Sequence, residues 1–439
     1  MIPRSVVLMA CVAACARAAS LNGEWMAEVS SATSEPQYAR VTLQSDAGKL
    51  TGTWGDSRVE GTLASGSIHL QLTGANGEPR GSLNGKSSGE DFAGDGSLAM
   101  PRRMGAGGGR GAGDLQAVAW KLSKIPQPPP GAPKTWNFEP AVFYSYYSAK
   151  NPPALHVFPG DTVRTWTVDA GGVGPKMERL SRGGDATTGP FYVEGALPGD
   201  TLVVKLNRVR TNRATARQGS RINAHAVTAA YAASAQYSAN FDGEWLLDGD
   251  RKIARLSHPT ERLKNLTVPI LPMLGCLAVA PAGDEVYRGT DLGPFGGNMD
   301  YNQNIEGTTL YFPVFHPGGL FVLGDGHAAM GDGELTGSAL ETSMDVEFTV
   351  NVVKGYATAA PRAETDGFLI SFGIAGSVAE AIQNATSQLA AWLKRDYRLN
   401  DSEVALLLGA VMKYEITELV DPKYNVVAKV PKSALAALQ

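Results

Sequence analysis

The stretch GTTLYFPVFHPGGLFVLGD, residues 307–325, is typical of the segments that decide the fold. Apolar runs of strand length alternate in it with turn residues, and the pattern recurs in ALHVFPGDTVRTWTVD (154–169), GPFYVEGALPGDTLVVKLNRV (189–209) and SMDVEFTVNVVKG (343–355). Short runs of this kind, bounded by Gly, Pro, Asp and Asn, are typical of β-strands. We therefore expect mostly β-structure from residue 135 to about residue 355.

After this region the hydrophobic period changes from that of strands to that of helices. Ser377 followed by Glu380 predicts a helix that starts with a capping box, and the apolar residues that follow lie on one helical face. Asn400 with Glu403 repeats the signal for a second helix, and a last strand is expected near residues 424–430. The predicted fold class is mainly β with C-terminal helices, a β-rich α+β fold, and residues 135–439 form its larger domain.

A second, smaller β region precedes this domain. Residues 19–125 show short alternating segments separated by glycine turns, which predict an antiparallel meander that closes into a small barrel or a sandwich. Residues 116–122 are the expected closing strand, and the glycine-rich residues 100–114 are expected to form a flexible loop. A proline-rich linker at residues 126–134 is predicted to separate the two domains.

The first residues predict export. A positive charge at Arg4, an apolar run and small residues up to Ala18 are typical of a signal peptide over residues 1–18. The chain is then expected to be secreted or periplasmic, with cleavage after Ala18. Because Val12 to Cys15 also resembles a lipobox, processing as a lipoprotein through Cys15 is the alternative.

The composition makes nucleic acid an unexpected partner. The net charge is −4 and 19% of the residues are charged, so the chain lacks the basic excess that binding to nucleic acid requires. Beyond the N-terminal segment, no stretch is long and apolar enough for a transmembrane span. Cys276 would be the one cysteine of the processed chain, so no intramolecular disulfide is expected.

The densest cluster of polar residues lies in GDGHAAMGDGELTGSALE, residues 324–341, and follows GGNMDYNQNIEG at 296–307. The first of these stretches holds one imidazole and four carboxylates between its glycines: His327, Asp325, Asp332, Glu334 and Glu341. Side chains at i and i+2 can face the same side of an extended strand, and this set of donors suits a divalent metal. Turns alone would also explain Gly-Asp-Gly. Asp169, at a strand end beside glycine, could reach a shared site or could simply be a turn residue.

The sequence gives little support for a serine or a cysteine as the nucleophile. The Gly-x-Ser-x-Gly match at Gly85 to Gly89 lies in the meander, without the helix that a nucleophile elbow requires. Cys276 lies in an apolar stretch, which is typical of a buried thiol. An activated water is the nucleophile that remains.

From about Leu155 to Ser433 the chain resembles the acetamidase/formamidase family. The motifs that carry the resemblance are TGPFYVEGALPGDTL, MLGCLAVAPAGDE, GGNMD, TLYFPVFHPGGLFVLGDGHAAMGDGELTGSALE and VVAKVPKS, whereas the N-terminal 125 residues lie outside it. The resemblance implies a β-rich fold with added helices, a homo-oligomer, and hydrolysis of short amides such as formamide and acetamide to a carboxylate and ammonia. It also implies assistance by a divalent metal such as zinc.

The family's motifs can be carried over to residues of this chain. Asp169 matches its Asp-Ala/Ser-Gly-Gly segment, Asn298 and Asp300 match Gly-Gly-Asn-Met-Asp, and the set Asp325, His327, Asp332 and Glu334 matches the two Gly-Asp-Gly motifs. Four positions depart from the family. Phe295 replaces a histidine, Ala186-Thr187 replaces His-Pro, and Met330 replaces a glutamine. The substrate or the activity is therefore expected to differ from that of typical members.

The hypothesis that follows assigns His327, Asp300 and Asp169 as metal ligands, and a metal-activated water as the nucleophile that attacks the amide carbonyl. Glu334 would carry the proton to the departing ammonia, a role that it could exchange with Glu341. Asp325, Asp332 and Asn298 complete the expected catalytic set. The alternative is a protein that binds a metal or a small molecule on the same fold, without catalysis or with altered specificity.

Overall fold

The computed structural model describes residues 21–32, 34–99, 114–238, 241 and 243–438. It divides the chain into two compact units, residues 1–125 and 126–439. The predicted signal peptide (1–18), its Cys15 alternative and residues 100–113 of the predicted loop lie outside the described residues. Among the residues described, the helices are all too short or too polar to cross a membrane.

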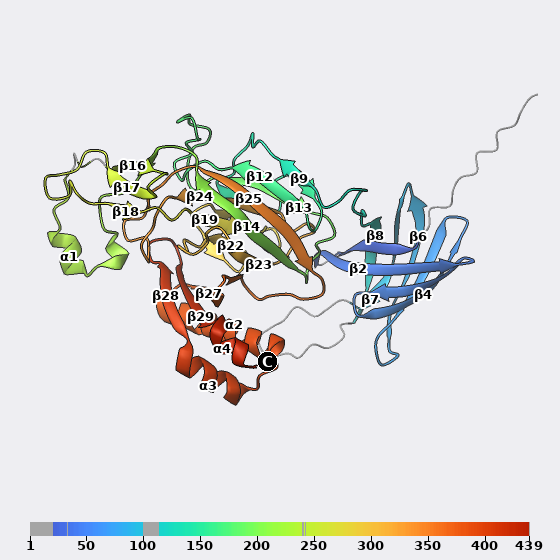
Figure 1. The fold of residues 1–439 in the computed structure, drawn as a ribbon. Helices are drawn as coiled ribbons and strands as arrows, with labels where there is room; N and C mark the ends of the chain where they lie inside the picture. Colours follow the sequence, from blue (N-terminus) through green and yellow to red (C-terminus); the bar gives the residue numbers. More distant parts are fainter. Residues whose placement is uncertain (1–20, 33, 100–113, 239–240, 242, 439) are drawn as a thin grey trace, which may run out of the picture. The chain divides into compact units, whose positions relative to one another are not determined.

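The smaller unit is a closed eight-stranded barrel, drawn in blue in Figure 1. Its strands are β1 (Gly23–Ser31), β2 (Ser34–Asp46), β3 (Lys49–Trp54), β4 (Ser57–Ala64), β5 (Ser67–Thr73), β6 (Pro79–Ser88), β7 (Asp91–Ala99) and β8 (Leu115–Lys124). Each strand pairs antiparallel with the next, and β1 pairs with β8 to close the barrel. The predicted meander is thus confirmed, and of the two predicted forms it takes the barrel.

Alternation along the barrel strands fills its interior with side chains. Trp25, Leu43, Leu70 and Leu122 are at most 1% exposed and belong to one apolar cluster. Tight turns join several strands. The β2–β3 turn, for example, uses positive φ at Ala47 and at Gly48, the backbone that two-residue hairpins favour.

Two large sheets form the body of the larger unit. The six-stranded sheet has the order β11-β13-β24-β19-β22-β21, and the nine-stranded sheet has the order β28-β29-β27-β26-β23-β14-β25-β12-β9. The strands of the first are β11 (Leu155–Val157), β13 (Thr187–Val193), β24 (Phe321–His327), β19 (Met273–Ala278), β22 (Gly296–Asn298) and β21 (Leu292–Gly293). Those of the second are β28 (Lys413–Glu418), β29 (Tyr424–Pro431), β27 (Phe368–Ala375), β26 (Arg362–Glu364), β23 (Thr309–Pro313), β14 (Thr201–Thr211), β25 (Met344–Val353), β12 (Thr162–Trp166) and β9 (Thr135–Asn137). Apolar side chains from both sheets, among them Phe191, Leu323, Leu206 and Phe348, share one buried core.

Smaller elements complete the larger unit. A four-stranded sheet contains β15 (Thr215–Arg217), β16 (Glu244–Asp248), β17 (Ile253–Leu256) and β18 (Val268–Pro269), and a two-stranded sheet contains β10 (Tyr146–Tyr147) and β20 (Tyr287–Arg288). The short helices are η1 (Ala224–Ala226), α1 (Ala229–Ser234), α4 (Lys432–Leu435) and η2 (Ala436–Leu438). Figure 1 places α1 close to the four-stranded sheet.

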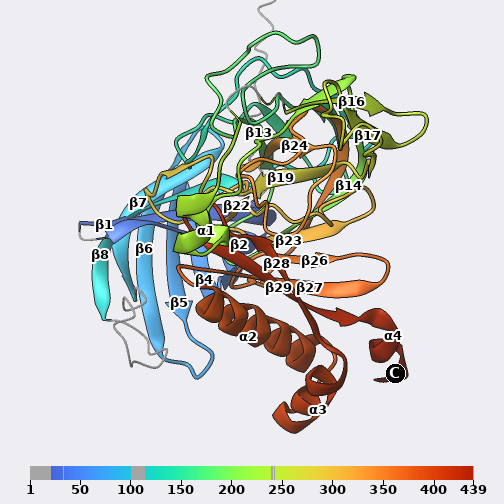
Figure 2. The same ribbon diagram turned by 90° about the vertical axis from the view of Figure 1, so that its left-hand side faces the viewer.

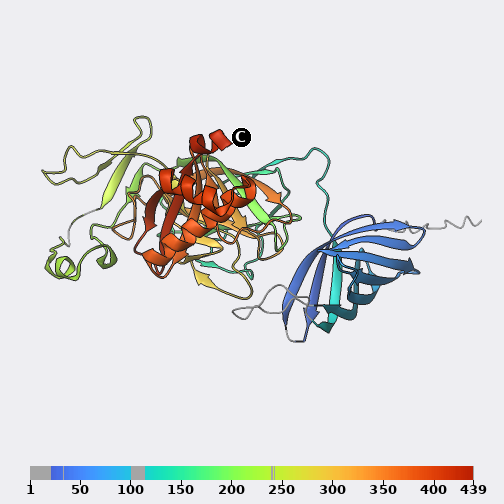
Figure 3. The same cartoon turned by 90° about the horizontal axis from the view of Figure 1, so that it is seen from below.

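Two longer helices cover one end of the nine-stranded sheet, as predicted. These are α2 (Val378–Asp396) and α3 (Asp401–Val411). Leu389 of α2 and Leu408 of α3 pack in a cluster with Leu369 of β27 and Val430 of β29. Figure 2 shows α2 beside these strands, and Figure 3 shows both helices from below.

Candidate metal centre

Strand β24 places polar side chains of the site in the buried interior. All seven of its residues are buried, and it lies between β13 and β19 in the six-stranded sheet. Its last residues include Asp325 and His327, two positions apart, and Met273 of β19 pairs with His327. A histidine and a carboxylate in the middle of a sheet must find polar partners there, because water cannot reach them.

Four carboxylates surround the imidazole of His327. Its Nε2 lies 3.3 Å from Asp325 Oδ2, 3.3 Å from Glu341 Oε2 and 3.9 Å from Glu334 Oε1. On the other side of the ring, Nδ1 lies 3.8 Å from Asp300 Oδ1. We call these five residues the His327 cluster. Side-chain exposure is 0% for His327 and Asp300, and at most 10% for the other three members.

Two further acidic residues adjoin this cluster through Asp300. Ligand atoms of Asp300, Glu418 and Asp421 all lie within 4.8 Å of one another, and the same holds for Asp300 with His327 and Glu334, and for Asp325 with His327 and Glu341. Each of these three sets could hold a metal ion. The larger unit therefore contains a continuous group of buried metal-ligating side chains.

The backbone carries strain at three of the cluster's carboxylates. Asp300, Asp325 and Glu334 have φ values of 40°, 54° and 46°, in the left-handed region that residues with a Cβ rarely adopt. Strained backbone persists only where the surrounding fold enforces it, and it concentrates at functional sites. The fold thus directs these side chains inward at a cost in backbone energy.

A glycine leaves the space into which two carboxylates point. A Cβ added at Gly275 in β19 would lie 2.4 Å from Asp300 Oδ1 and 2.4 Å from Asp325 Oδ2. The absence of a side chain at this position lets both oxygens approach the same strand.

Many polar atoms of the cluster, and one of the adjoining Glu418, lack hydrogen-bond partners within the described residues. They are both oxygens of Asp300, both ring nitrogens of His327, Asp325 Oδ1, Glu341 Oε2 and Glu418 Oε2. Buried polar atoms are normally satisfied, and each exception asks for an explanation such as an ion. One imidazole and several carboxylates that converge without partners form a donor set that fits a divalent cation.

Burial and the crowding of carboxylates shift the pKa values of the cluster's side chains. Burial, together with Glu334 and Asp325, raises the pKa of Asp300 well above its usual range. Burial also raises the pKa of Glu334 well above its usual range and that of Glu341 to about 7. Although burial alone would lower the pKa of His327, the carboxylates of Glu341 and Asp325 raise it well above its usual value. Such shifted groups are typical of functional sites.

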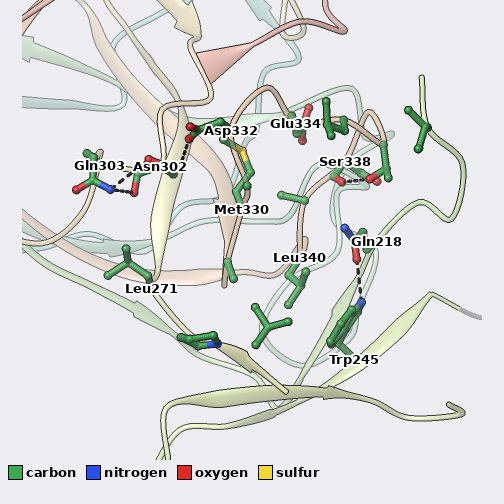
Figure 4. Close-up of a pocket in the computed structure, with 18 residues that line it drawn as sticks. Gln218, Trp245, Leu271, Asn302, Gln303, Met330, Asp332, Glu334, Ser338 and Leu340 are labelled. Carbon is green, nitrogen blue, oxygen red and sulfur yellow. Dashed lines mark hydrogen bonds between the residues drawn. The ribbon is translucent and has the colours of Figure 1, made fainter. Parts of the chain in front are cut away.

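Two neighbouring cavities, which share Gln218 and Ser338 in their linings, reach the cluster. One has a volume of about 680 Å³ and is lined by Glu334 together with mostly apolar side chains, among them Trp245, Leu271 and Leu340 (Figure 4). We call it the apolar pocket. The other, of about 570 Å³, is lined by Glu341 with Arg179 and Arg217. Each cavity therefore contacts one carboxylate of the cluster.

Comparisons with known proteins agree with this geometry. Residues 293–434 match the Acetamidase/Formamidase family, and this range includes every residue of the His327 cluster. The larger unit is therefore similar to the acetamidase/formamidase family in sequence over this range and in fold. A predicted acetamidase/formamidase from Thermoanaerobacter tengcongensis is 26% identical, with a TM-score of 0.59 over 70% of this chain and 98% of that one. Acetamidase from Bacillus halodurans is 26% identical, with a TM-score of 0.58 over 69% of this chain and 99% of that one.

The chain is also similar to a curated protein, acetamidase from Mycolicibacterium smegmatis. The two sequences are 24% identical over 221 residues, which cover 38% of this chain and 53% of the relative. The chain thus matches about half the length of this relative.

Most of the site residues predicted from sequence lie close together in this acetamidase/formamidase fold. His327, Asp300, Asp325 and Glu334 are members of the cluster, as is Glu341. Asn298 lies at its edge, where its amide nitrogen donates a hydrogen bond to Asp421 Oδ2 at 2.8 Å. Its amide oxygen accepts from Cys276 Sγ at 3.0 Å. Cys276 is buried, as expected.

The structure does not bring Asp169, a predicted metal ligand, or Asp332, a predicted catalytic residue, into the cluster. Arg213 donates to Asp169 Oδ2 at 2.5 Å, and this nearly buried ion pair occupies the carboxylate that was predicted to bind metal. Asp332 accepts a hydrogen bond from Asn302 at 2.7 Å, beside the apolar pocket. Both residues line cavities next to the cluster without contributing a ligand atom to it.

Glu418 and Asp421 are the residues that the sequence analysis missed. They lie at the end of β28 and in the loop before β29, more than a hundred positions after Asp300. Glu-Leu-Val-Asp at 418–421 was the only available signal, and it resembles any surface turn. Full burial of Glu418 is what distinguishes it.

The structure shows where the residues that depart from the family's pattern lie. Phe295 is 2% exposed, and its ring packs on those of Tyr147 (5.3 Å between centroids) and Tyr287 (4.9 Å). Met330 lines the apolar pocket. Thr187 pairs with Gly324, directly before Asp325. Met330 and Thr187 therefore lie beside the site, and Phe295 and Met330 are more apolar than the histidine and glutamine that they replace.

Proposed function

We propose that this chain is an amide hydrolase that cleaves the C–N bond of linear amides to a carboxylate and ammonia, with a divalent cation such as zinc bound at the His327 cluster. The main support is the set of buried carboxylate and imidazole atoms that have no hydrogen-bond partner among the described residues. A cation would satisfy them and would reduce the repulsion among the carboxylates. Kinship with acetamidases and formamidases supports the reaction class.

The cation could be held by His327 with Asp325 and Glu341, a set that leaves Glu334 free to transfer a proton, while Asp300 lies on the other side of the ring. Asp169 is left out, because Arg213 already neutralises it. A bound divalent cation supplies two effects, polarisation of a carbonyl oxygen and a lower pKa for a coordinated water.

In this proposal, Glu334 transfers the proton. Its carboxyl lines the apolar pocket and lies 3.9 Å from the imidazole of His327, so it faces both the substrate cavity and the cluster. Burial raises its pKa well above the usual range, which favours the protonated form of the carboxyl. It can therefore give that proton to the departing nitrogen.

The test is the substitution His327→Ala. We expect bound metal, measured by mass spectrometry of the purified protein, to be lost together with ammonia release from formamide and acetamide. His156→Ala is the matched control, since His156 is exposed and hydrogen-bonded to Glu194 outside the cluster. Undiminished ammonia release by a folded His327→Ala protein would refute the proposal.

A second function has one observation in its favour. The position at which relatives usually carry histidine before Gly-Gly-Asn-Met-Asp is the buried Phe295, which cannot bind a metal or a substrate amide through a ring nitrogen. A protein that binds metal or a small molecule without catalysis would keep the cluster and lose this group. Bound metal in the wild-type protein, with no ammonia from any amide, would identify that function.

Export is a further part of the proposal, and it rests on the sequence of residues 1–18 alone. Fusion of this segment to a reporter protein that is active only outside the cytoplasm would test it. Assembly into a homo-oligomer also stays a prediction, which sedimentation of the purified protein would check.

A further inference from the structure

The geometry points to a substrate class for this site: linear amides whose acyl group is a long apolar chain, of about four to eight carbons, which lies in the apolar pocket. This inference rests on the proposed amide hydrolysis and extends it from very small amides to larger ones. Its basis is the size, lining and position of the pocket.

The apolar pocket is too large for formamide or acetamide alone. Its volume is about 680 Å³, within the range of roughly 300–1,000 Å³ that is typical of sites for drug-sized ligands. A four-atom amide would displace only a few water molecules of about 30 Å³ each. Most of the cavity would then remain filled with water against apolar walls.

The walls of the pocket are apolar on the sides away from the cluster. Trp245 and Leu340 are buried members of a small apolar cluster, and Leu271 and Leu335 are 46% and 45% exposed. Large apolar side chains that line a cavity and remain half exposed gain from being covered by an apolar ligand. Figure 4 shows Leu271, Leu340 and Trp245 on the side of the pocket opposite Asp332 and Glu334.

The polar groups of the pocket lie at its edges and hold its shape. Trp245 Nε1 donates to Gln218 Oε1 at 3.1 Å, which fixes the plane of the indole ring. Asn302 donates to Asp332 at 2.7 Å on the other side of the pocket. Both hydrogen bonds are drawn as dashed lines in Figure 4. These pairs satisfy each other and leave the apolar surface between them free for a chain without polar groups.

Glu334 joins the pocket to the cluster. It lines the pocket with a side chain that is 7% exposed, and it is one of the four carboxylates around His327. An amide whose carbonyl lies at the cluster can therefore extend its acyl chain past Glu334 toward Leu340 and Leu271. Met330 lies on the same wall and adds a flexible apolar side chain, which suits chains of varied shape.

The experiment compares straight-chain amides from acetamide to octanamide. We expect kcat/KM for ammonia release to rise about fourfold for each added methylene until the pocket is filled, because burial of a methylene is worth about 0.8 kcal/mol. Leu271→Gln should lower the ratio of hexanamide to acetamide turnover about tenfold. Leu271→Met, which keeps an apolar chain of similar size, is the matched control.

A binding measurement separates this inference from the proposed reaction. Saturation-transfer NMR of hexanamide on the metal-stripped full-length protein should show contact at the alkyl protons, and Leu271→Gln should weaken it while Leu271→Met should not. Contact without ammonia release would support the pocket and refute the hydrolase. Acetamide turnover that equals or exceeds hexanamide turnover, with no alkyl contact, would overturn the inference and leave the hydrolase standing.

Discussion

At the scale of single residues, Gly275 is tightly constrained by two carboxylates of the centre. The substitution Gly275→Ala would place a methyl group 2.4 Å from one oxygen each of Asp300 and Asp325, much closer than a real Cβ approaches any atom. Both carboxylates would have to move away from His327. We expect metal affinity to fall by roughly 10–100-fold, as is usual when the groups that orient metal ligands are disturbed.

Chelator competition on the purified protein would measure this affinity. Gly367→Ala is a suitable control, because a Cβ there meets nothing within 4 Å and the backbone is not left-handed. If Gly275→Ala retained wild-type affinity, the cation could not depend on the positions of Asp300 and Asp325.

Side chains next to the cluster show a second pattern at this scale. Tyr147 donates a hydrogen bond to Cys276 Sγ at 3.1 Å, Cys276 lies 3.0 Å from Asn298 Oδ1, and Asn298 donates to Asp421. Burial raises the pKa of the Cys276 thiol well above its usual value, so the thiol stays protonated and acts as a link in this chain. The residue that the sequence analysis set aside as a buried thiol therefore helps to position an acidic neighbour of the centre.

At the scale of elements, helix α3 begins with a complete capping box. Asn400 Oδ1 accepts from the backbone nitrogen of Glu403, and the Glu403 carboxylate accepts from that of Asn400. Asn400→Ala should lower the free energy of unfolding by about 1 kcal/mol, the usual effect of losing an N-cap. Urea denaturation followed at the helical circular-dichroism band would measure it. Ser402→Ala, an exposed change in the same turn, should shift stability much less, and equal losses would contradict the role of the cap.

The elements were predictable from sequence because their signals are local. The caps at Ser377 and Asn400 start α2 and α3, and the alternating stretches of the N-terminal region are the strands of the barrel. His327 and Asp325 could be expected to lie on the same face of the sheet, because they are two positions apart on one strand. Such patterns depend only on near neighbours along the chain.

Contacts between distant elements were not predictable in the same way. Arg213 lies 44 positions from Asp169, and nothing near either residue indicates the ion pair that removes Asp169 from the metal centre. Glu418 joins Asp300 only because the packing of the two large sheets brings them together. Sheet register and packing decide these contacts, and a single sequence does not display them.

At the scale of the whole molecule, the buried carboxylates link the stability of the larger unit to pH. Burial is the main reason that the pKa rises from 3.8 to about 8 for Asp421, from 3.8 to about 9 for Asp185 and from 4.5 to about 7 for Glu341. A group whose pKa is higher in the folded than in the unfolded state contributes stability that is fully present below the unfolded value. This contribution is lost as pH rises through the folded value.

We therefore expect the melting temperature of the metal-stripped protein to fall as pH rises from about 5 to 9. Added zinc should raise it more at pH 8 than at pH 6, because metal ligands must be deprotonated. Differential scanning fluorimetry with and without the cation would check both trends. A melting temperature of the stripped protein that rises with pH over this range would contradict the burial of these carboxyls.

The pairing of β1 with β8 has a consequence for how the smaller unit can meet other proteins. Among the described residues of that unit, every strand already has a neighbour on both sides, so none of these strands leaves a row of backbone amides and carbonyls open to accept a foreign strand. Recognition there must use exposed side chains and turns. Such contacts can change by point substitution without any repacking of the interior, so this unit can exchange binding partners while its own fold stays the same.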